Sequence, residues 1–346
     1  MTDDVWTIKA ALEWTQGYLA RKGDENPRLS AEWLLAEATG LRRVELYVNF
    51  ERPLSMEERD ILRGYVSRRG AGEPLQYITG EVAFRHIAVK VRPGVLIPRP
   101  ETEVLVSEAL SLLPPAGRRV ARDSQIGAWE GDLLRAAEAA VGESGDGSDA
   151  FSQVASALEE AGGFSSEGAE ASGDSGAETL FVADLCTGSG CIAVSLTKNL
   201  EEAEVVSWDV SEKALQVAER NCRRNGVRVT LEQRDVLLAS PAGEQFDVIV
   251  SNPPYITEKE KANMSANVLE WEPELALFVP DDSPLLFYRK IAELGRDMLG
   301  SGGRLYFEIN QEYGRETVDM LAGLGYKNIE LRKDLFQNDR MIKAEK

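Results

Sequence analysis

Short apolar runs alternate with longer amphipathic segments from Leu180 to the end of the chain. The runs are rich in β-branched and aromatic residues, which is typical of strands, and apolar residues recur at helical spacing between them. This alternation predicts a largely parallel sheet with helices on both faces. The last two runs predict a hairpin that places one antiparallel strand in the sheet. The expected strands are 180–186, 204–210, 227–236, 246–252, 303–310, 326–335 and 340–346. A loop and helix are expected over 187–200, and further helices at 211–226, 285–299 and 314–325.

The N-terminal part has the periodicity of a small helical bundle, and we expect a separate domain over residues 1–78. Ser55 and Glu58 form a capping-box pattern at the start of one of its helices. Apolar residues near helical spacing in the first helix are expected to lie in the core. They are Val5, Ile8, Leu12, Trp14 and Leu19, and the further helices are expected at 28–40, 42–50 and 54–70.

A stretch of period-two alternation follows and predicts a hairpin linker over residues 79–96. Pro98 and Pro100 then end the extended chain. Glu101 and Glu103 are expected in the first turn of a helix, where the helix dipole favours acidic side chains. Residues 97–346 are predicted to form the second domain.

Residues 117–178 differ in composition from the rest of the chain. They are rich in Gly, Ser, Ala and acidic residues, and such segments bury too little apolar surface to offset the entropy of ordering. They carry 13 acidic and 4 basic residues, a net charge of −9 out of −19 for the whole chain. We expect a partly disordered acidic insertion into the second domain.

Composition excludes several functional classes. The chain holds 3 Cys and 1 His, which provide neither a disulfide framework nor a metal site, so no metal is expected. No apolar run is long enough to cross a membrane. The acidic N-terminus does not resemble a signal peptide, so a cytoplasmic protein is expected. The negative charge argues against direct nucleic-acid binding.

Three of the predicted strands end in residues suited to a nucleoside-bearing cofactor, which open α/β sheets bind at the carboxyl ends of their strands. Gly188 and Gly190, after Asp184, let the backbone approach a ligand. Asp209 is placed to bind both hydroxyls of a ribose, and Asp235–Val236 to border an adenine. Each feature also fits a plain turn or a helix start. NAD stays open on these residues alone.

The fourth strand ends in the sequence Asn252-Pro253-Pro254-Tyr255. An ordinary turn is one interpretation, since Asn and Pro favour turns. The alternative is chemical: the Asn252 side-chain carbonyl and the Pro253 backbone carbonyl can accept the two hydrogens of a planar –NH₂ group, on which Tyr255 can stack. This arrangement would direct a nitrogen at an electrophile, such as the methyl group of S-adenosylmethionine.

The chain resembles the HemK/PrmC family of N5-glutamine methyltransferases, which modify peptide chain release factors. The resemblance covers nearly the whole chain except the insertion and is most specific in IPRPETE and in the helical N-terminal domain. It implies a seven-stranded, Rossmann-like class I methyltransferase domain preceded by a small helical domain that recognises the substrate. The motifs that carry it are PLQYITGEVAF (74–84), VLIPRPETEVLV (95–106), DLCTGSGCIA (184–193), VSNPPYI (250–256) and EPELALFVPDDSPLLFYRKI (272–291).

The resemblance also implies S-adenosylmethionine as cofactor and the glutamine of the release-factor GGQ motif as substrate. Catalytic roles fall on Asn252, Pro253 and Tyr255, and substrate contacts on the same residues with Pro254. Val236 stands where some relatives carry a larger ring, and the acidic insertion has no counterpart in the usual short connection. The implied cofactor contacts are Cys186, Thr187, Gly188, Ser189, Gly190, Asp209, Asp235, Val236 and Asn252.

Two other functions stay open from the sequence. An adenine-N6 or guanine-N2 nucleic-acid methyltransferase would use Asn252 in the same way, but would need a basic groove or a target-recognition domain, and neither is evident. A non-catalytic protein could retain the cofactor fold, although the intact Asn252–Tyr255 motif argues against it. A monomer is expected.

Overall fold

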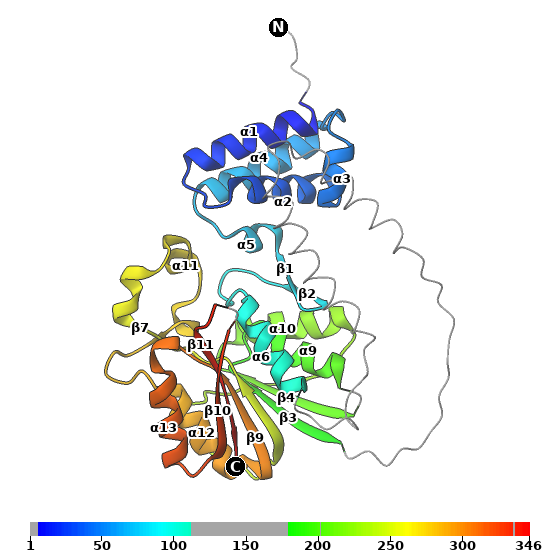
Figure 1. The fold of residues 1–346 in the computed structure, drawn as a ribbon. Coiled ribbons are helices and arrows are strands. Elements are labelled where there is room, and N and C mark those ends of the chain that lie inside the picture. The colour runs from blue at the N-terminus through cyan, green and yellow to red at the C-terminus, as the bar shows by residue number, and fades with distance from the viewer. Residues whose placement is uncertain (1–5, 112–178, 201, 335) are drawn as a thin grey trace, which may run out of the picture.

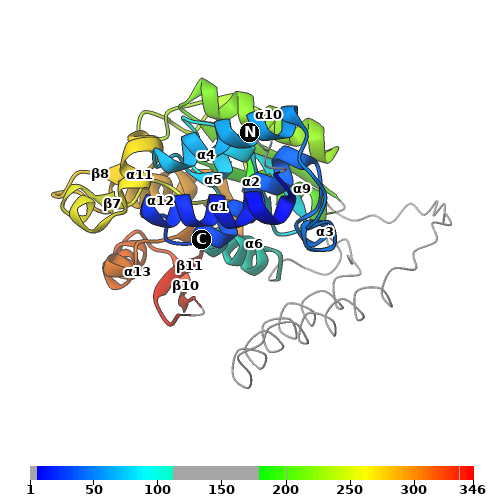
Figure 2. The ribbon, with the colours of Figure 1, turned by 90° about the horizontal axis from the view of Figure 1, so that it is seen from above.

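The computed structural model describes residues 6–111, 179–200, 202–334 and 336–346. A helical bundle lies at one end of the molecule, above an α/β domain whose sheet carries the C-terminus at the far end (Figure 1). Viewed from above, the bundle covers much of the α/β domain (Figure 2). The predicted insertion, 117–178, lies outside the described residues, and the predicted domain limits stay predictions.

The bundle is built around a core of fully buried Leu, Ile and Ala side chains contributed by its helices. The predicted capping box is confirmed: the Ser55 hydroxyl accepts from Glu58 N at 3.1 Å, and Glu58 Oε2 accepts from Ser55 N at 2.8 Å. The core prediction is confirmed for Ile8, Leu12 and Leu19 and is wrong for Trp14, which is 47% exposed and stacks on Tyr18; Val5 lies outside the described residues. The helices are α1 (Ile8–Arg21), α2 (Pro27–Thr39), α3 (Arg43–Val48), α4 (Met56–Gly70) and α5 (Leu75–Thr79).

The predicted hairpin is also present, as β1 (Glu81–Phe84) paired antiparallel with β2 (Ile87–Lys90). Asn221 holds it against the α/β domain, because its side-chain amide accepts from Lys90 N at 2.7 Å and donates to Lys90 O at 3.0 Å. The hairpin therefore has a fixed place on the α/β domain.

The main sheet has seven strands in the order β10-β11-β9-β6-β3-β4-β5. β3 pairs in parallel with both β4 and β6, and β11 is antiparallel to β9 and β10, so the single antiparallel strand is confirmed. The prediction for 227–236 was too long, since only four residues form β5. The strands are β3 (Leu180–Leu185), β4 (Ala203–Asp209), β5 (Thr230–Gln233), β6 (Phe246–Ser251), β9 (Leu299–Glu308), β10 (Lys327–Lys333) and β11 (Asp339–Glu345).

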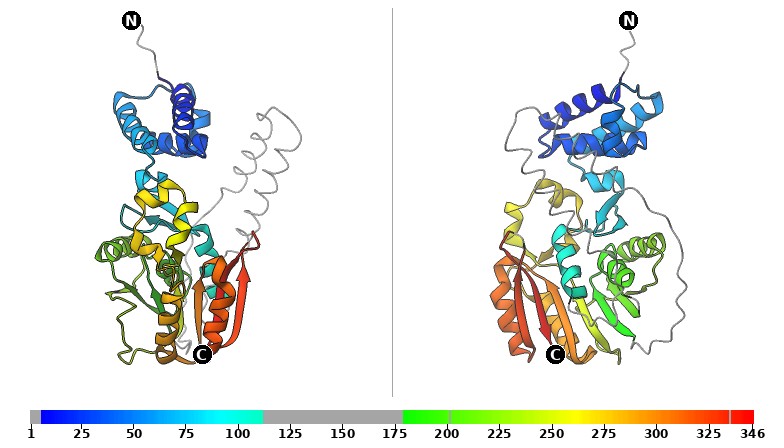
Figure 3. Two further views of the ribbon diagram at one scale, coloured as in Figure 1. Left: turned by 90° about the vertical axis from the view of Figure 1, so that its left-hand side faces the viewer. Right: turned by 45° about the vertical axis from the view of Figure 1, so that its right-hand side comes forward.

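Two apolar cores, one on each face, bury the sheet. Alternate residues of β3 show this: Val182 belongs to the core beneath the helices α6, α9 and α10, and Ala183 to the core beneath α12 and α13. The two helical layers flank the sheet in Figure 3. The helices are α6 (Pro100–Ser111), α9 (Cys191–Asn199), α10 (Glu212–Asn225), α12 (Leu286–Met298) and α13 (Gly314–Gly323).

A long excursion between β6 and α12 folds back over the sheet edge. It holds a two-stranded parallel pair and several short helical turns. A further short turn, η5 (Gln311–Tyr313), follows β9. The excursion consists of β7 (Ile256–Thr257), η3 (Glu258–Asn263), α11 (Ala266–Trp271), η4 (Glu274–Ala276) and β8 (Phe278–Val279).

Replacing glycine with alanine should have opposite effects on stability at Gly190, the residue before α9, and at Gly64 of α4. Gly190 has φ +79°, and an added Cβ would lie 2.9 Å from Ala218 Cβ, whereas a Cβ on Gly64 would meet nothing within 4 Å. Gly190→Ala should lower the free energy of unfolding by about 2–4 kcal/mol through strain and overpacking. Gly64→Ala should raise it by about 0.5–1 kcal/mol. Urea unfolding of both variants tests this, and equal midpoints would contradict it.

Candidate functional site

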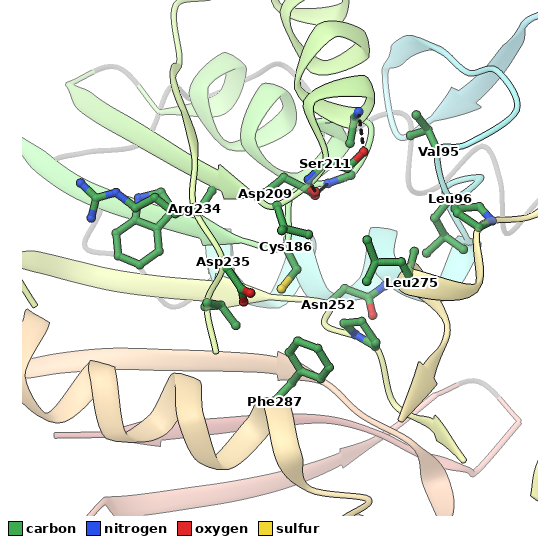
Figure 4. Close-up of a pocket in the computed structure, with 18 of the residues that line it drawn as sticks. Val95, Leu96, Cys186, Asp209, Ser211, Arg234, Asp235, Asn252, Leu275 and Phe287 are labelled. Atoms are coloured by element: carbon green, nitrogen blue, oxygen red, sulfur yellow. Dashed lines mark hydrogen bonds between the residues drawn. The ribbon is translucent and has the colours of Figure 1, made fainter. Parts of the chain in front are cut away.

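The carboxyl ends of β3, β4 and β6 lie next to one another at one end of the sheet, where the sequence predicts the site. The loop after β3, the end of β4 and the segment after β6 face a common cavity. Figure 4 shows Cys186 and Asn252 near its middle, Asp209 and Ser211 on one side and Phe287 on the other. Its walls are completed by residues from the linker, the stretch after β5 and the excursion, namely Val95, Leu96, Arg234, Asp235, Val236, Leu237, Leu275 and Ala276.

The glycine-containing loop is tied to the end of β4. Gly188 N donates to Asp209 Oδ2 at 2.8 Å, and Thr187 N donates to Trp208 O at 3.0 Å. Cys186 has φ +65°, a left-handed conformation that costs free energy for a residue with a side chain. Cys186 and Gly188 line the cavity, while Thr187, Ser189 and Gly190 are buried and shape the loop.

Asp209 presents its carboxylate to the cavity with both oxygens already held by the backbone. Besides the bond from Gly188, Asp209 Oδ1 accepts from Ser211 N at 2.8 Å. Burial raises the pKa of Asp209, while these two backbone bonds oppose that shift. Each carboxylate oxygen can accept more than one hydrogen bond, so the group can still accept from the hydroxyls of a ligand.

Asp184, beneath the loop, is fully buried. Its Oδ2 accepts from Thr187 Oγ1 at 2.5 Å, and the backbone of Ala193 also contributes a hydrogen bond. Burial raises the pKa of Asp184 from 3.8 to about 7, and the bond from Thr187 opposes this. Asp184 does not line the cavity, so its bond from Thr187 fixes the loop from below.

The adenine side of the predicted site is mainly apolar. Val236 is buried, and Asp235 Oδ1 accepts from Leu237 N at 2.9 Å. The Arg234 guanidinium lies over the Trp208 ring, 4.4 Å from its centroid. Phe287 of α12 faces this wall across the cavity, so a flat ring can be enclosed despite the small side chain of Val236.

A second cavity adjoins the first. Asn252, Leu96 and Ala276 line both, so Asn252 lies on the boundary between them. Pro254 lines the first cavity, and Pro253 and Tyr255 line the second. The second cavity is completed by Arg99, Ile256, Met264, Val268 and Leu277.

A buried polar network fixes the motif at this boundary. Asn252 Nδ2 donates to Thr102 Oγ1 at 3.1 Å, and Thr102 Oγ1 donates to Glu308 Oε2 at 2.6 Å. Tyr255 OH donates to Glu308 Oε1 at 3.1 Å. Burial raises the pKa of Glu308, against the bonds from Thr102 and Tyr255.

A partly buried ion pair joins the segment before α6 to the excursion. Arg99 Nη2 lies 2.5 Å from Glu272 Oε1, and Glu272 Oε2 accepts from Ile97 N at 3.2 Å. Glu272 belongs to the excursion and Arg99 to the segment that leads into α6, so the pair holds these segments together.

Four residues that hold the site together were not predicted from the sequence, namely Thr102, Glu308, Arg99 and Glu272. Glu308 could have been found, because it is an acidic residue within an apolar strand, and such a residue needs a buried partner. Thr102 and Arg99 lie in the IPRPETE motif but gave no signal of their contacts. Among the described residues, no group of three His, Cys, Asp or Glu side chains could hold a metal ion, and no helix is long and apolar enough to cross a membrane.

Comparison with known proteins places the chain among methyltransferases. Two family profiles match it: the PrmC N-terminal domain over residues 10–80 and the methyltransferase small domain over residues 175–271. The release factor glutamine methyltransferase of Bacteroides thetaiotaomicron is 38% identical over 90% of this chain and 90% of its own length. That of Geobacter sulfurreducens is 37% identical over 98% and 96%.

A solved structure is similar as well. The protein-(glutamine-N5) methyltransferase (release factor-specific) of Alicyclobacillus acidocaldarius is 22% identical, with a TM-score of 0.35, and the match covers 74% of this chain and 98% of that one.

The buried Asp184 predicts a pH-dependent stability. The folded protein keeps the Asp184 proton up to about pH 7, whereas the unfolded chain loses it near pH 3.8. The folded state therefore binds more protons in this window, and its free energy of unfolding falls as the pH rises. Asp184→Asn removes this loss.

Relative to wild type, Asp184→Asn should gain roughly 2 kcal/mol between about pH 5.5 and about pH 8. Urea unfolding at both pH values measures the gain. Asp209 and Glu308 titrate in both proteins and cancel in the difference. A constant difference between the two proteins would show that Asp184 does not hold its proton when folded.

Proposed function

Because this chain belongs to the release factor glutamine methyltransferase family, we propose that it methylates the side-chain amide nitrogen of the glutamine in the GGQ motif of peptide chain release factors. The observation that carries the proposal is the position of Asn252 on the boundary of two adjoining cavities. One cavity is suited to a nucleoside-bearing cofactor, and the other can admit a side chain of a protein substrate.

The first cavity fits S-adenosylmethionine in its chemistry. Asp209 would hold the ribose hydroxyls, the apolar wall with Val236 and Phe287 would enclose the adenine, and the loop at Cys186 and Gly188 would face the methionine part. When bound, the cofactor supplies an electrophilic methyl group.

The residues of the second cavity orient the glutamine. Asn252 Oδ1 and the Pro253 carbonyl accept the two amide hydrogens, which favours a nitrogen with more lone-pair character and supports the positive charge that develops on it. Held by Asn252 Oδ1 and the Pro253 carbonyl, the amide nitrogen would face the methyl group that the cofactor would supply, and the amide would give up one proton to water. Holding both reactants in line contributes several kcal/mol to such a step.

Tyr255 supports this arrangement from the side. Its ring lines the second cavity, while its hydroxyl is held by Glu308 and its backbone carbonyl accepts from Asn310 Nδ2 at 3.1 Å. A ring held at both ends can stack on the planar amide without losing further conformational entropy. Pro254 completes the turn on the cofactor side.

The proposal includes the setting of the reaction. The helical domain recognises the release factor, the protein works as a cytoplasmic monomer, and its partner is a protein, not nucleic acid or a membrane. The negative charge of −19 supports a protein partner over nucleic acid. Mass spectrometry of a release factor incubated with the protein and labelled S-adenosylmethionine tests the function directly, and an unmodified GGQ glutamine would contradict it.

Asp209→Ala should weaken S-adenosylmethionine binding by roughly 1.5–3 kcal/mol, the range for hydrogen bonds to a charged group. Part of the loss comes from the Gly188 loop, which loses its acceptor. Isothermal titration calorimetry measures the affinity. Glu212→Ala, which removes an exposed acid in the first turn of α10, is the charge-matched control. Unchanged affinity in Asp209→Ala would remove Asp209 from the site.

Asn252→Ala should lower methyl transfer by at least ~10²-fold, comparable to the loss of one preorganised transition-state hydrogen bond. The fold should persist, because the side chain is only half-buried at a strand end. Single-turnover assays with saturating cofactor and release factor measure the rate. Asn199→Ala, at the far end of α9, serves as control. Normal turnover by a folded Asn252→Ala protein would leave Asn252 as a turn residue.

A further inference from the structure

The hydroxyl of Thr102 has two neighbours but only one proton. Its oxygen lies 2.6 Å from Glu308 Oε2 and 3.1 Å from the side-chain amide of Asn252. A carboxylate can only accept, so the hydroxyl proton points to Glu308. Toward Asn252 the same hydroxyl can then only accept, and it accepts from Nδ2.

This assignment decides which way round the Asn252 amide lies. An asparagine amide has nearly the same shape after a half-turn, so packing alone distinguishes its oxygen from its nitrogen poorly. With Nδ2 held by Thr102, Oδ1 is directed away from α6. The reversed amide would set two acceptors, Oδ1 and the Thr102 oxygen, against each other.

Water cannot take over this role, because Thr102 is 2% exposed and Glu308 1% exposed. The second oxygen of Glu308 accepts from Tyr255 OH. One carboxylate therefore holds Tyr255 directly and Asn252 through Thr102. The contact between Thr102 and Glu308 spans 206 positions of sequence and joins α6 to the end of β9.

We propose that Glu308, acting through Thr102, sets the amide of Asn252 so that its oxygen faces the substrate nitrogen, which makes Thr102 and Glu308 positioning residues for methyl transfer. The inference rests on the proposed function, since it assumes that Asn252 Oδ1 accepts from the glutamine amide. Neither residue lines either cavity.

The arrangement requires Glu308 in its ionised form. A protonated Glu308 could donate to Thr102, whose own proton would then be free to bond Asn252 Oδ1, and the two amide orientations would become similar in energy. The pKa of Glu308 is raised mainly by burial. Arg340 of β11 favours the ionised form and Glu101 of α6 opposes it. The other titratable groups facing Glu308 are Tyr255, Tyr288 of α12 and Cys191 of α9.

The kinetic test compares Thr102→Val, which keeps the shape but removes the hydroxyl, with Thr102→Ser, which keeps the hydroxyl. Thr102→Val should slow single-turnover methylation of a release factor by about 10–100-fold, as expected for loss of an orienting partner. Its calorimetric affinity for S-adenosylmethionine should match wild type, which also shows that it folds. Thr102→Ser should keep most of the rate.

A wild-type rate in Thr102→Val, or an equally slow Thr102→Ser, would overturn the proposal. A parallel loss of rate and cofactor affinity would also overturn it, because that pattern indicates a structural role.

A second measurement does not depend on the reaction. The ¹⁵N side-chain amide signals of Asn252, assigned by their absence in Asn252→Ala, should shift with pH as Glu308 titrates and should stop doing so in Glu308→Gln and in Thr102→Val. Coupled signals in a wild-type protein that does not methylate release factors would support the orientation and contradict the proposed function alone. Signals indifferent to both substitutions would overturn the inference.

Discussion

Parallel pairing of β3 with both β4 and β6 is the constraint on which the site depends. Leu185 pairs with Trp208 on one side and with Ser251 on the other. The residues that follow these three positions therefore lie side by side at the carboxyl ends of the strands. They are Cys186, Asp209 and Asn252. Both faces of the sheet are buried, so a slip of one residue would turn apolar side chains into the wrong core. The packing of the sheet thus fixes the chemistry at its edge.

The site keeps several polar groups where burial disfavours them. Burial raises the pKa of Asp184, Asp209 and Glu308, so each ionised carboxylate lowers the stability of the folded protein. Cys186 adds a left-handed backbone conformation. Hydrogen bonds from Thr187, Gly188 and Thr102 offset part of this cost. Such costs persist at functional sites because the surrounding packing holds the groups in place.

The sequence allowed the strand ends to be predicted because they obey a local rule. Apolar runs mark the strands, and the fold class then brings Asp209 and Asn252 to one edge. The lateral contacts had no such rule. Glu308 bonds to Thr102, and Arg99 to Glu272, across more than a hundred positions of sequence. The residues around each of them in the chain therefore do not indicate its partner. The Trp14 prediction was wrong for a different reason. The buried stripe of α1 runs through Ile8, Ala11, Leu12, Thr15 and Leu19, and Trp14 lies off this stripe.

The segment from Val95 to Arg99 connects the parts of the molecule that the proposed reaction must bring together. Val95 lines the first cavity, Leu96 lines both and Arg99 lines the second. Tyr77 of α5 donates its hydroxyl to Val95 O at 2.6 Å, and Glu272 holds the other end of the segment.

Helix α5 is therefore bonded directly to the segment that lines both cavities. Proximity catalysis is sensitive to displacements of about 1 Å. In the proposed function, contacts between a release factor and the helical bundle would reach Asn252 through this short segment.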